Sequence, residues 1–264
     1  MASSGRRGGG EKGDGSGIRA LRGTGRAEDA AGDGLVPGRH GAPRSVLRMQ
    51  YGRPRAVFVV RRGSTCGMGL PVSHADREKW DERYRLGAYE DRTHPSAWLE
   101  RWVPEVTVGR ALDIPCGAGR NALYLASMGF SVTGIDISAV ALVRAAATAR
   151  ARGLSAEWIR RDLDNGHGVT GTFELIVVIH YVDVDLVRDL ADLLVPGGHL
   201  IVELHLETDR PVAGPRDPAF RVAPGALRDA AGHLELLGYS EEIVEDPDGR
   251  TVALARLAGR QPRR

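Results

Sequence analysis

Residues 112–122 read Leu-Asp-Ile-Pro-Cys-Gly-Ala-Gly-Arg-Asn-Ala and decide the fold class. They join a short apolar strand to a helix through a loop that contains Gly117 and Gly119. A glycine lets a ligand approach the backbone, because no Cβ intervenes. The following helix offers unpaired N–H groups and the positive end of its dipole. The segment therefore predicts a nucleotide-like ligand at the carboxyl end of the first strand.

Carboxylates stand on both sides of this loop. Asp113 precedes it, and Asp136 ends the second predicted strand, 19 residues after Gly117. A carboxylate at that position can accept hydrogen bonds from ribose hydroxyls. Asp162-Leu163 follows the third predicted strand, where we expect it to hold the edge of an adenine. By itself, Gly117-x-Gly119-x-x-Ala122 also fits the dinucleotide fingerprint, which is weak evidence.

Strand and helix patterns alternate on both sides of the loop. Helices are predicted at 74–84, 95–102, 120–128, 138–153 and 185–194, and strands at 111–114, 131–135, 156–159, 173–179 and 199–204. Extended runs at 234–245 and 251–257 flank Pro247-Asp248-Gly249, a hairpin turn signal. The fold class is therefore α/β: Rossmann-like and doubly wound, with a mostly parallel seven-stranded sheet that ends in a C-terminal antiparallel hairpin.

The motifs resemble those of class I S-adenosylmethionine-dependent methyltransferases over residues 76–258. Residues 111–121 resemble motif I, 132–138 the acidic second motif, 161–163 the adenine motif, 173–178 the fourth strand and 194–198 the later loop. Trp80, Arg83-Tyr84-x-x-Gly87 and Pro115-x-Gly117 are most similar to the tellurite-resistance and thiopurine methyltransferase group. Glu174 departs from the usual Asp of the fourth strand, and residues 205–222 offer few candidates for a fixed general base.

The resemblance implies a site for S-adenosylmethionine and a small-molecule acceptor. The expected cofactor-binding residues are Trp80, Arg83, Asp113, Gly117, Gly119, Asn121, Asp136, Ile137, Asp162, Leu163 and His180. The expected acceptor-side residues are Tyr84, Tyr181 and Phe220. Each has a plainer interpretation as well: Asp113 as a loop or helix cap, Asp162 as a turn residue, Trp80 and Tyr84 as core packing.

The expected reaction is methyl transfer by in-line displacement to a soft sulfur, selenium or tellurium nucleophile or an oxyanion. Such nucleophiles need no general base at neutral pH. For an alcohol or amine, His180 and His205 are the catalytic candidates, because imidazole titrates near neutrality. Arg83 is a candidate to attract an anionic acceptor. A metal site built from His180, His205 and Asp183 is not expected.

Three other functions remain open on the sequence. A non-catalytic S-adenosylmethionine- or nucleotide-binding protein could have the same fold. An NAD(P)-dependent oxidoreductase is disfavoured, because Lys79 is the only lysine after residue 70 and a Tyr-x-x-x-Lys constellation is missing. An RNA methyltransferase would use the basic N-terminal segment, although the acidic remainder argues against a broad phosphate-binding face.

Charge divides the chain into a basic leader and an acidic body. Residues 1–70 hold 13 Lys and Arg against 5 Asp and Glu, with 17 of the 35 glycines, and residues 71–264 hold 23 against 29. Such a leader cannot bury enough apolar surface to order itself. We expect a disordered Arg/Gly-rich leader at 1–71, a methyltransferase domain at 72–260 and a tail at 261–264.

The role of the leader stays open between three interpretations. It is inert, or translated from a misassigned start with Met68 as the natural one; it is a targeting segment; or it contacts nucleic acid. The sequence has no apolar run long enough to span a membrane. Cys66 and Cys116 suggest no disulfide framework. We expect a cytoplasmic monomer or weak dimer that does not bind a membrane. Nucleic acid is not an expected partner.

Overall fold

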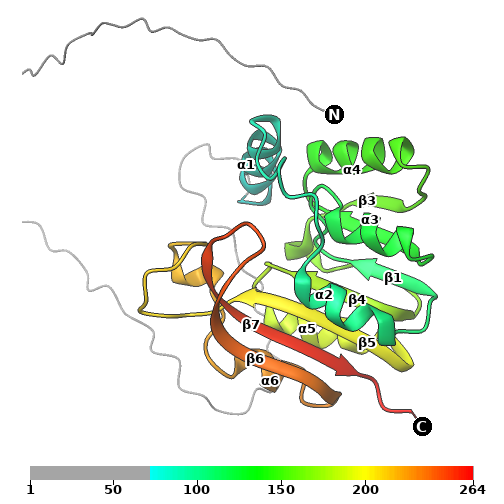
Figure 1. The fold of residues 1–264 in the computed structure, drawn as a ribbon. Coiled ribbons are helices and arrows are strands. Elements are labelled where there is room, and N and C mark those ends of the chain that lie inside the picture. The colour runs from blue at the N-terminus through cyan, green and yellow to red at the C-terminus, as the bar shows by residue number, and fades with distance from the viewer. Residues whose placement is uncertain (1–71, 264) are drawn as a thin grey trace, which may run out of the picture. The chain divides into compact units, whose positions relative to one another are not determined.

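The computed structural model describes residues 72–263, and the predictions made for 1–71 lie outside the described residues. The helices are α1 (Val72–Arg85), α2 (Ala97–Trp102), α3 (Arg120–Ser127), α4 (Ala139–Ala151), α5 (Val184–Ala191) and α6 (Ala226–Ala230). The strands are β1 (Arg110–Asp113), β2 (Ser131–Asp136), β3 (Glu157–Arg160), β4 (Phe173–Ile179), β5 (Leu194–His205), β6 (Glu235–Glu245) and β7 (Thr251–Arg260). Figure 1 shows this arrangement.

One seven-stranded sheet carries the fold, in the order β3-β2-β1-β4-β5-β7-β6. The first five strands are parallel, and β7 runs antiparallel to both β5 and β6. The strand order reverses between β1 and β4, so the loop after β1 opens at the topological switch point, where open α/β sheets bind ligands. The predicted fold class is confirmed.

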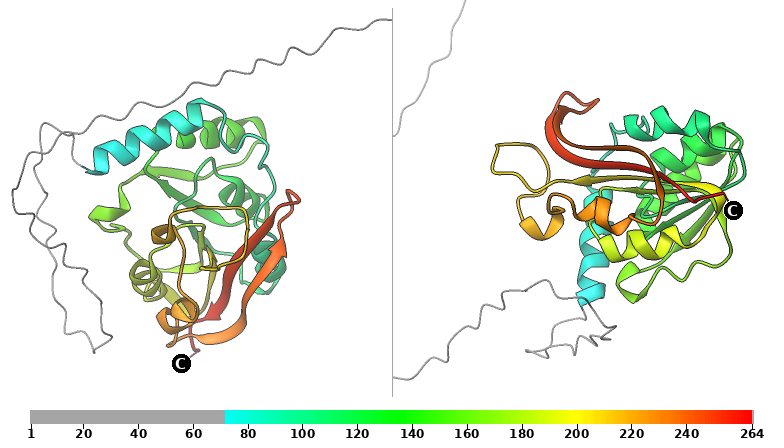
Figure 2. Two further views of the ribbon diagram at one scale, coloured as in Figure 1. Left: turned by 90° about the vertical axis from the view of Figure 1, so that its left-hand side faces the viewer. Right: turned by 90° about the horizontal axis from the view of Figure 1, so that it is seen from below.

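Helices cover both faces of the sheet (Figure 2). Trp98 and Leu99 of α2, together with Ala122 and Leu125 of α3, pack on one face. Leu186 and Leu190 of α5, with Leu227 of α6, pack on the other. Strand β4 lies between the two layers, and six of its seven residues are buried. This explains its nearly continuous apolar sequence, which is typical of a central parallel strand.

The structure differs from the sequence prediction around Pro196-Gly197-Gly198. Helix α5 ends at Ala191 and β5 begins at Leu194, whereas the prediction continued the helix to residue 194 and began the strand at 199. The register between β4 and β5 shifts within this segment, so the Pro-Gly-Gly residues form an irregularity inside the strand. Pro95 also lies outside α2, because Ser96 is the N-cap and its hydroxyl accepts a hydrogen bond from the Trp98 amide.

The C-terminal hairpin is longer than predicted on its second strand, which continues to Arg260. Its turn at residues 246–250 is held by Asp246, which accepts hydrogen bonds from the amides of Asp248 and Arg250. Because β7 is antiparallel to β5, this turn lies at the carboxyl edge of the parallel strands. The hairpin therefore borders the same edge as the glycine loop.

Candidate active site

The glycine loop after β1 is tied directly to the acid that ends β2. The Gly117 amide donates a hydrogen bond to Oδ2 of Asp136 at 2.8 Å, and the Ser138 amide donates to Oδ1 of the same carboxylate at 2.8 Å. Both loop glycines have positive φ, +54° at Gly117 and +82° at Gly119. The left-handed backbone excludes most side chains and brings the loop close to Asp136. Each Asp136 oxygen keeps a lone pair for a ligand.

Asp113 is fully buried at the start of this loop. Its Oδ2 accepts a hydrogen bond from the Ala122 amide at 3.0 Å, which supports the predicted capping interpretation. Its Oδ1 is buried without a hydrogen-bond partner among residues 72–263. Burial raises the pKa of Asp113 to about 7. A buried unsatisfied oxygen costs free energy, so this atom is a candidate acceptor for a ligand.

A shallow cavity of about 250 Å³ lies beside Asp136, on the side of β3. Its lining includes Ile137 and Asp162, both predicted to hold the adenosyl group, together with Arg77, Arg160 and Arg161. Asp162 also caps the short 3-10 helix that begins at Leu163, accepting a hydrogen bond from the Asp164 amide. Asp162 therefore serves the turn and faces the cavity, whereas the Leu163 side chain packs against the core.

Helix α1 covers the glycine loop through Tyr84. Tyr84 is buried, and a Cβ added at Gly117 would lie 2.6 Å from its hydroxyl oxygen. Burial, with Asp136 as a second cause, raises the pKa of Tyr84 well above its usual range. Tyr84 was predicted on the acceptor side, and the structure places its hydroxyl on the loop itself.

The other predicted residues of α1 lie further from the loop. Arg83 is exposed, stacks on the ring of Trp80 at 4.9 Å and donates a hydrogen bond to the Tyr89 hydroxyl. Arg83 thus lies between the aromatic rings of Trp80 and Tyr89. Phe220 is 52% exposed and contacts Lys79 of α1, so the segment after β5 reaches the same helix.

His180 and His205 stack face to face at the ends of β4 and β5. Their ring centroids are 4.5 Å apart and their planes differ by 13°. Burial lowers the pKa of His180 well below its usual value, and it lowers the pKa of His205 to about 4. Nearby arginines add to both shifts. Both rings are therefore neutral at physiological pH, in an electropositive environment. The structure brings the two predicted candidate bases together.

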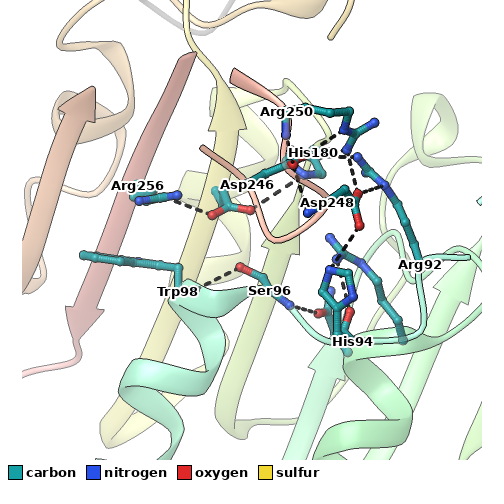
Figure 3. A network of polar contacts seen from close by, with 12 residues as sticks. Arg92, His94, Ser96, Trp98, His180, Asp246, Asp248, Arg250 and Arg256 are labelled. Carbon is teal, nitrogen blue, oxygen red and sulfur yellow. Dashed lines mark hydrogen bonds and ion pairs between the residues drawn. The ribbon is translucent and has the colours of Figure 1, made fainter. Parts of the chain in front are cut away.

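A network of ion pairs joins the hairpin tip to the segment between α1 and α2 (Figure 3). Arg92 contacts Asp248 at 2.7 Å and Asp246 at 3.4 Å, and His94 lies 3.5 Å from Asp248. Arg250 binds both aspartates. We refer to these five residues as the hairpin clasp. The charge of Arg92, a member of this clasp, also acts on His180 at the end of β4.

Behind His180, Glu203 of β5 bridges the histidine to the hairpin. Its Oε1 lies 3.6 Å from Nε2 of His180, and its Oε2 accepts a hydrogen bond from Nε of Arg256 at 3.0 Å. Glu203 is buried, so the pair with Arg256 offsets the cost of removing its charge from water. Glu203 thus lies between the His180 ring and the guanidinium of Arg256.

The remaining predicted residues lie near the site in supporting positions. Asn121 is buried, and its Oδ1 accepts a hydrogen bond from the Ser96 amide at 2.9 Å, which fixes the start of α2. Tyr181 packs against the core, and burial raises its pKa. Among residues 72–263, no group of three or more His, Cys, Asp or Glu side chains is arranged to hold a metal ion.

Sequence reasoning missed several residues that shape the site. Arg92, Glu203 and Asp246 match no local motif, and Arg120 and Asp248 lie in quoted motifs but were not singled out as site residues. Asp81 of α1, which binds the first turn of α4, was also missed. Asp81 lies between Trp80 and Tyr84, whose spacing of four residues predicts a shared helix face. That pattern is the local signal that could have drawn attention to Asp81.

The geometry fits an adenosyl sulfonium ligand. Asp136 accepts the Gly117 amide, Ile137 and Asp162 border the neighbouring cavity, and the unsatisfied Asp113 oxygen lies at the start of the loop. The family model described as "Methyltransferase domain" matches residues 111–198. Over these residues the chain is similar to the class I S-adenosylmethionine-dependent methyltransferase family. The cofactor of this family is S-adenosylmethionine.

Two curated methyltransferases are similar to the chain as well. A thiopurine S-methyltransferase from Nitrosospira multiformis is 28% identical over 211 residues, which cover 69% of this chain and 94% of the relative. The putative methyltransferase YqeM of Bacillus subtilis is 27% identical over 146 residues. That alignment spans about half of each protein, 51% of this chain and 51% of YqeM.

Solved structures share the fold. TehB from Haemophilus influenzae superposes with a TM-score of 0.57 at 22% identity, covering 69% of this chain and 67% of TehB. The magnesium protoporphyrin IX methyltransferase of Synechocystis, solved with bound SAM, superposes with a TM-score of 0.52 at 16% identity, covering 74% of this chain and all of that chain. Within residues 72–263, no helix is both long and apolar enough to cross a membrane.

Proposed function

We propose that this protein transfers the methyl group of S-adenosylmethionine to a small-molecule acceptor. The observation that carries the proposal is the 2.8 Å hydrogen bond from the Gly117 amide to Asp136, next to the cavity bordered by Ile137 and Asp162. This arrangement joins a ribose acceptor, an adenine pocket and a glycine loop at the switch point of the sheet.

The protein contributes position more than acid–base chemistry. When bound, the cofactor supplies a methyl group on a positively charged sulfur, which is already a good leaving group. Alignment of reactants can lower a barrier by roughly 7–11 kcal/mol in favourable cases. Helix α1 packs on the glycine loop and the hairpin clasp lies at this edge of the sheet, and we propose that both exclude water and hold the acceptor in line.

We propose a soft sulfur, selenium or tellurium nucleophile or an oxyanion as acceptor. The name of the Nitrosospira relative describes methylation at sulfur, which supports this class. The two neutral histidines support it as well, since such nucleophiles need no strong base. For an alcohol or amine acceptor, His180 would be the first candidate base, because the carboxylate of Glu203, 3.6 Å from its Nε2 atom, would stabilise the protonated ring.

The cofactor part of the proposal is tested by isothermal titration with S-adenosylmethionine, S-adenosylhomocysteine and NAD. We expect binding of the first two and none of NAD. Affinity for NAD alone would overturn the proposal. The variant Asp136→Ala should bind S-adenosylhomocysteine more weakly than the parent protein. The variant Asp189→Ala, which changes an exposed residue of α5, is its control.

The transfer part is tested with radiolabelled methyl groups against a panel of thiols, selenite, tellurite, alcohols and amines. Turnover with at least one small acceptor is expected. Cofactor binding without turnover across the panel would favour a non-catalytic binding protein. The same assay with total RNA, run on the full chain and on a chain beginning at residue 71, tests the RNA alternative. A cytoplasmic location and a monomer or weak dimer remain predictions.

A further inference from the structure

Three arginines line the cavity beside Asp136. Arg77 comes from α1, Arg160 ends β3 and Arg161 follows it, and Asp162 is the acid of the same lining. Among the described residues, none of the three guanidinium groups forms an ion pair with a carboxylate. The cavity thus gathers positive charges from two separate elements without pairing them.

The side chains of Arg160 and Arg161 are both held against backbone. Nε of Arg160 donates a hydrogen bond to the carbonyl oxygen of Ile137 at 3.3 Å, which leaves its two terminal nitrogens available to a ligand. The guanidinium of Arg161 lies so close to Gly168 that a Cβ at this glycine would collide with it. Because the two side chains already have contacts that fix them, they lose less freedom when a ligand binds.

Helix α1 presents Arg77 on the face that it packs against the site. Arg77, Asp81 and Tyr84 are spaced four and three residues apart, so they follow one another along one side of the helix. Asp81 binds the first turn of α4, and Tyr84 covers the glycine loop. Arg77 continues this face to the cavity, where it joins the two arginines at the end of β3.

Two carboxylates lie at the cavity, and each already accepts two hydrogen bonds. Asp162 accepts both within its own turn, and Asp136 accepts two backbone amides. Three cations against two acids leave a positive charge here, although residues 71–264 hold only 23 basic against 29 acidic residues. The base and ribose of S-adenosylmethionine carry no negative charge that would need three guanidinium groups. Guanidinium groups match the oxygens of a phosphate, so a phosphate group fits this lining better.

The position of Arg160 relative to Asp136 indicates where on a nucleotide this phosphate would be attached. Strands β2 and β3 are parallel, and the two residues are partners in the register between them. Adjacent strands lie about 4.8 Å apart, so Arg160 is beside the acid proposed to take the ribose hydroxyls. In dinucleotide-binding folds, an arginine at this edge accommodates a phosphate on the ribose. The ribose hydroxyls, and not the 5′ end, are therefore expected near the arginines.

We propose that the cavity binds the phosphate of an adenosine that is phosphorylated on a ribose hydroxyl, with Arg77, Arg160 and Arg161 as its partners. This inference rests on the adenosyl site of the proposed function. The remaining ribose hydroxyl stays available to Asp136. Because such a nucleotide and S-adenosylmethionine need the same ribose position, they exclude each other, and the nucleotide inhibits methyl transfer.

The test measures the binding of five ligands to the full chain by titration calorimetry: the 2′-, 3′- and 5′-phosphates of adenosine, adenosine itself and inorganic phosphate. We expect the 2′- or the 3′-phosphate to bind at least about tenfold more tightly than adenosine, the scale of charge-assisted contacts. The same nucleotide should displace S-adenosylhomocysteine competitively. Inorganic phosphate should bind at least about tenfold more weakly than that nucleotide, because it lacks the adenosine contacts.

The variant Arg160→Gln tests whether the arginines are responsible. It should lower the ratio of nucleotide affinity to adenosine affinity by about threefold or more. Both ligands are measured on the same sample, so partial unfolding does not change this ratio. A 5′-phosphate would meet the glycine loop instead, so its affinity should not depend on Arg160. The control Arg152→Gln, at the exposed end of α4, should leave every ratio unchanged. If Arg160→Gln does not fold, Arg161→Gln replaces it with the same expectation.

Three results would overturn the proposal. The first is that neither the 2′- nor the 3′-phosphate binds more tightly than adenosine. The second is that the arginine variant keeps the parent ratio, which would mean that the arginines serve the base, or that it weakens the 5′-phosphate by the same factor. The third is that inorganic phosphate binds as tightly as the nucleotide, which would indicate a site for a free anion.

Failure of the proposed methyl transfer gives a different result. If S-adenosylhomocysteine does not bind while a ribose-phosphorylated adenosine binds through Arg160, the function is wrong and the phosphate site stands. If S-adenosylhomocysteine binds and the added phosphate brings no gain in affinity over adenosine, the function stands and the phosphate site is wrong.

Discussion

The Oδ1 atom of Asp81 lies 2.6 Å from the Oγ atom of Ser138, which links helix α1 to the first turn of helix α4. The same oxygen accepts a hydrogen bond from the Val140 amide at 3.2 Å. Ser138 also donates its amide to Asp136. Asp81 thus helps to cap a helix to which it does not belong, and through Ser138 it connects α1 to Asp136.

We expect Asp81→Ala to lower the free energy of unfolding by about 1–2 kcal/mol, the usual cost of losing a helix cap. Cofactor affinity should fall as well, because α1 carries Tyr84 against Gly117. Urea unfolding and calorimetric titration with S-adenosylhomocysteine measure the two effects. Glu78→Ala, an exposed change on the same helix, is the control. Equal losses in both variants would argue against the link.

Replacing Asp136 by alanine should weaken S-adenosylhomocysteine binding by about 1.5–3 kcal/mol, the range for a hydrogen bond to a charged group. The substitution removes the acceptor of both the Gly117 and Ser138 amides. Titration calorimetry measures the change, with Asp189→Ala as the control. Unchanged affinity would remove Asp136 from the site.

The closeness of Gly117 to Tyr84 predicts a coupled pair of mutations. Gly117→Ala should destabilise the protein by about 1–3 kcal/mol, because its backbone is left-handed and the new Cβ would meet the tyrosine hydroxyl. Tyr84→Phe in the same chain should restore part of the stability but not the cofactor affinity. Thermal unfolding and titration of the single and double variants measure both quantities. Strict additivity of the two stability effects would show that the residues do not interact.

The hairpin clasp should contribute measurably to stability. Arg92 and Asp248 are 18% and 25% exposed at their side chains, so their ion pair is only partly screened by water. We expect Asp248→Ala to lower the unfolding free energy by about 1–2 kcal/mol at low salt and by less at high salt. Limited proteolysis should cleave residues 246–250 faster in the variant. Glu82→Ala, which breaks an exposed pair with Arg85, should cost about 0.5 kcal/mol or less.

The buried His205 predicts how stability changes with pH. Its pKa is lowered by burial to about 4 in the folded protein, whereas an unfolded histidine titrates near about 6.5. The unfolded chain therefore binds more protons in this range, and stability should decrease as the pH falls from about 6.5 toward 4. Urea unfolding of His205→Gln should show a shallower loss over the same range than the parent protein. The surface variant His233→Gln should keep the parent slope, and identical slopes in all three would contradict the prediction.

Local sequence patterns were enough to predict the sheet and one end of the site. The apolar run of β4, the glycines after β1 and the acid at the end of β2 are each recognisable from a few consecutive residues. Backbone conformation and burial follow from such short-range patterns, so the fold class and the position of Asp136 could be predicted. The end of α5 was missed because Pro196-Gly197-Gly198 stays within an irregular strand.

The sequence by itself therefore determined the class of fold and the position of the glycine loop and Asp136 at one edge of the sheet. The tertiary structure alone decided what faces that edge: Asp81 reaches a partner 57 residues away, and Arg92 reaches Asp246 across 154 residues. Ion pairs and side-chain hydrogen bonds of this kind depend on how loops meet after the sheet has formed, and no local periodicity encodes them.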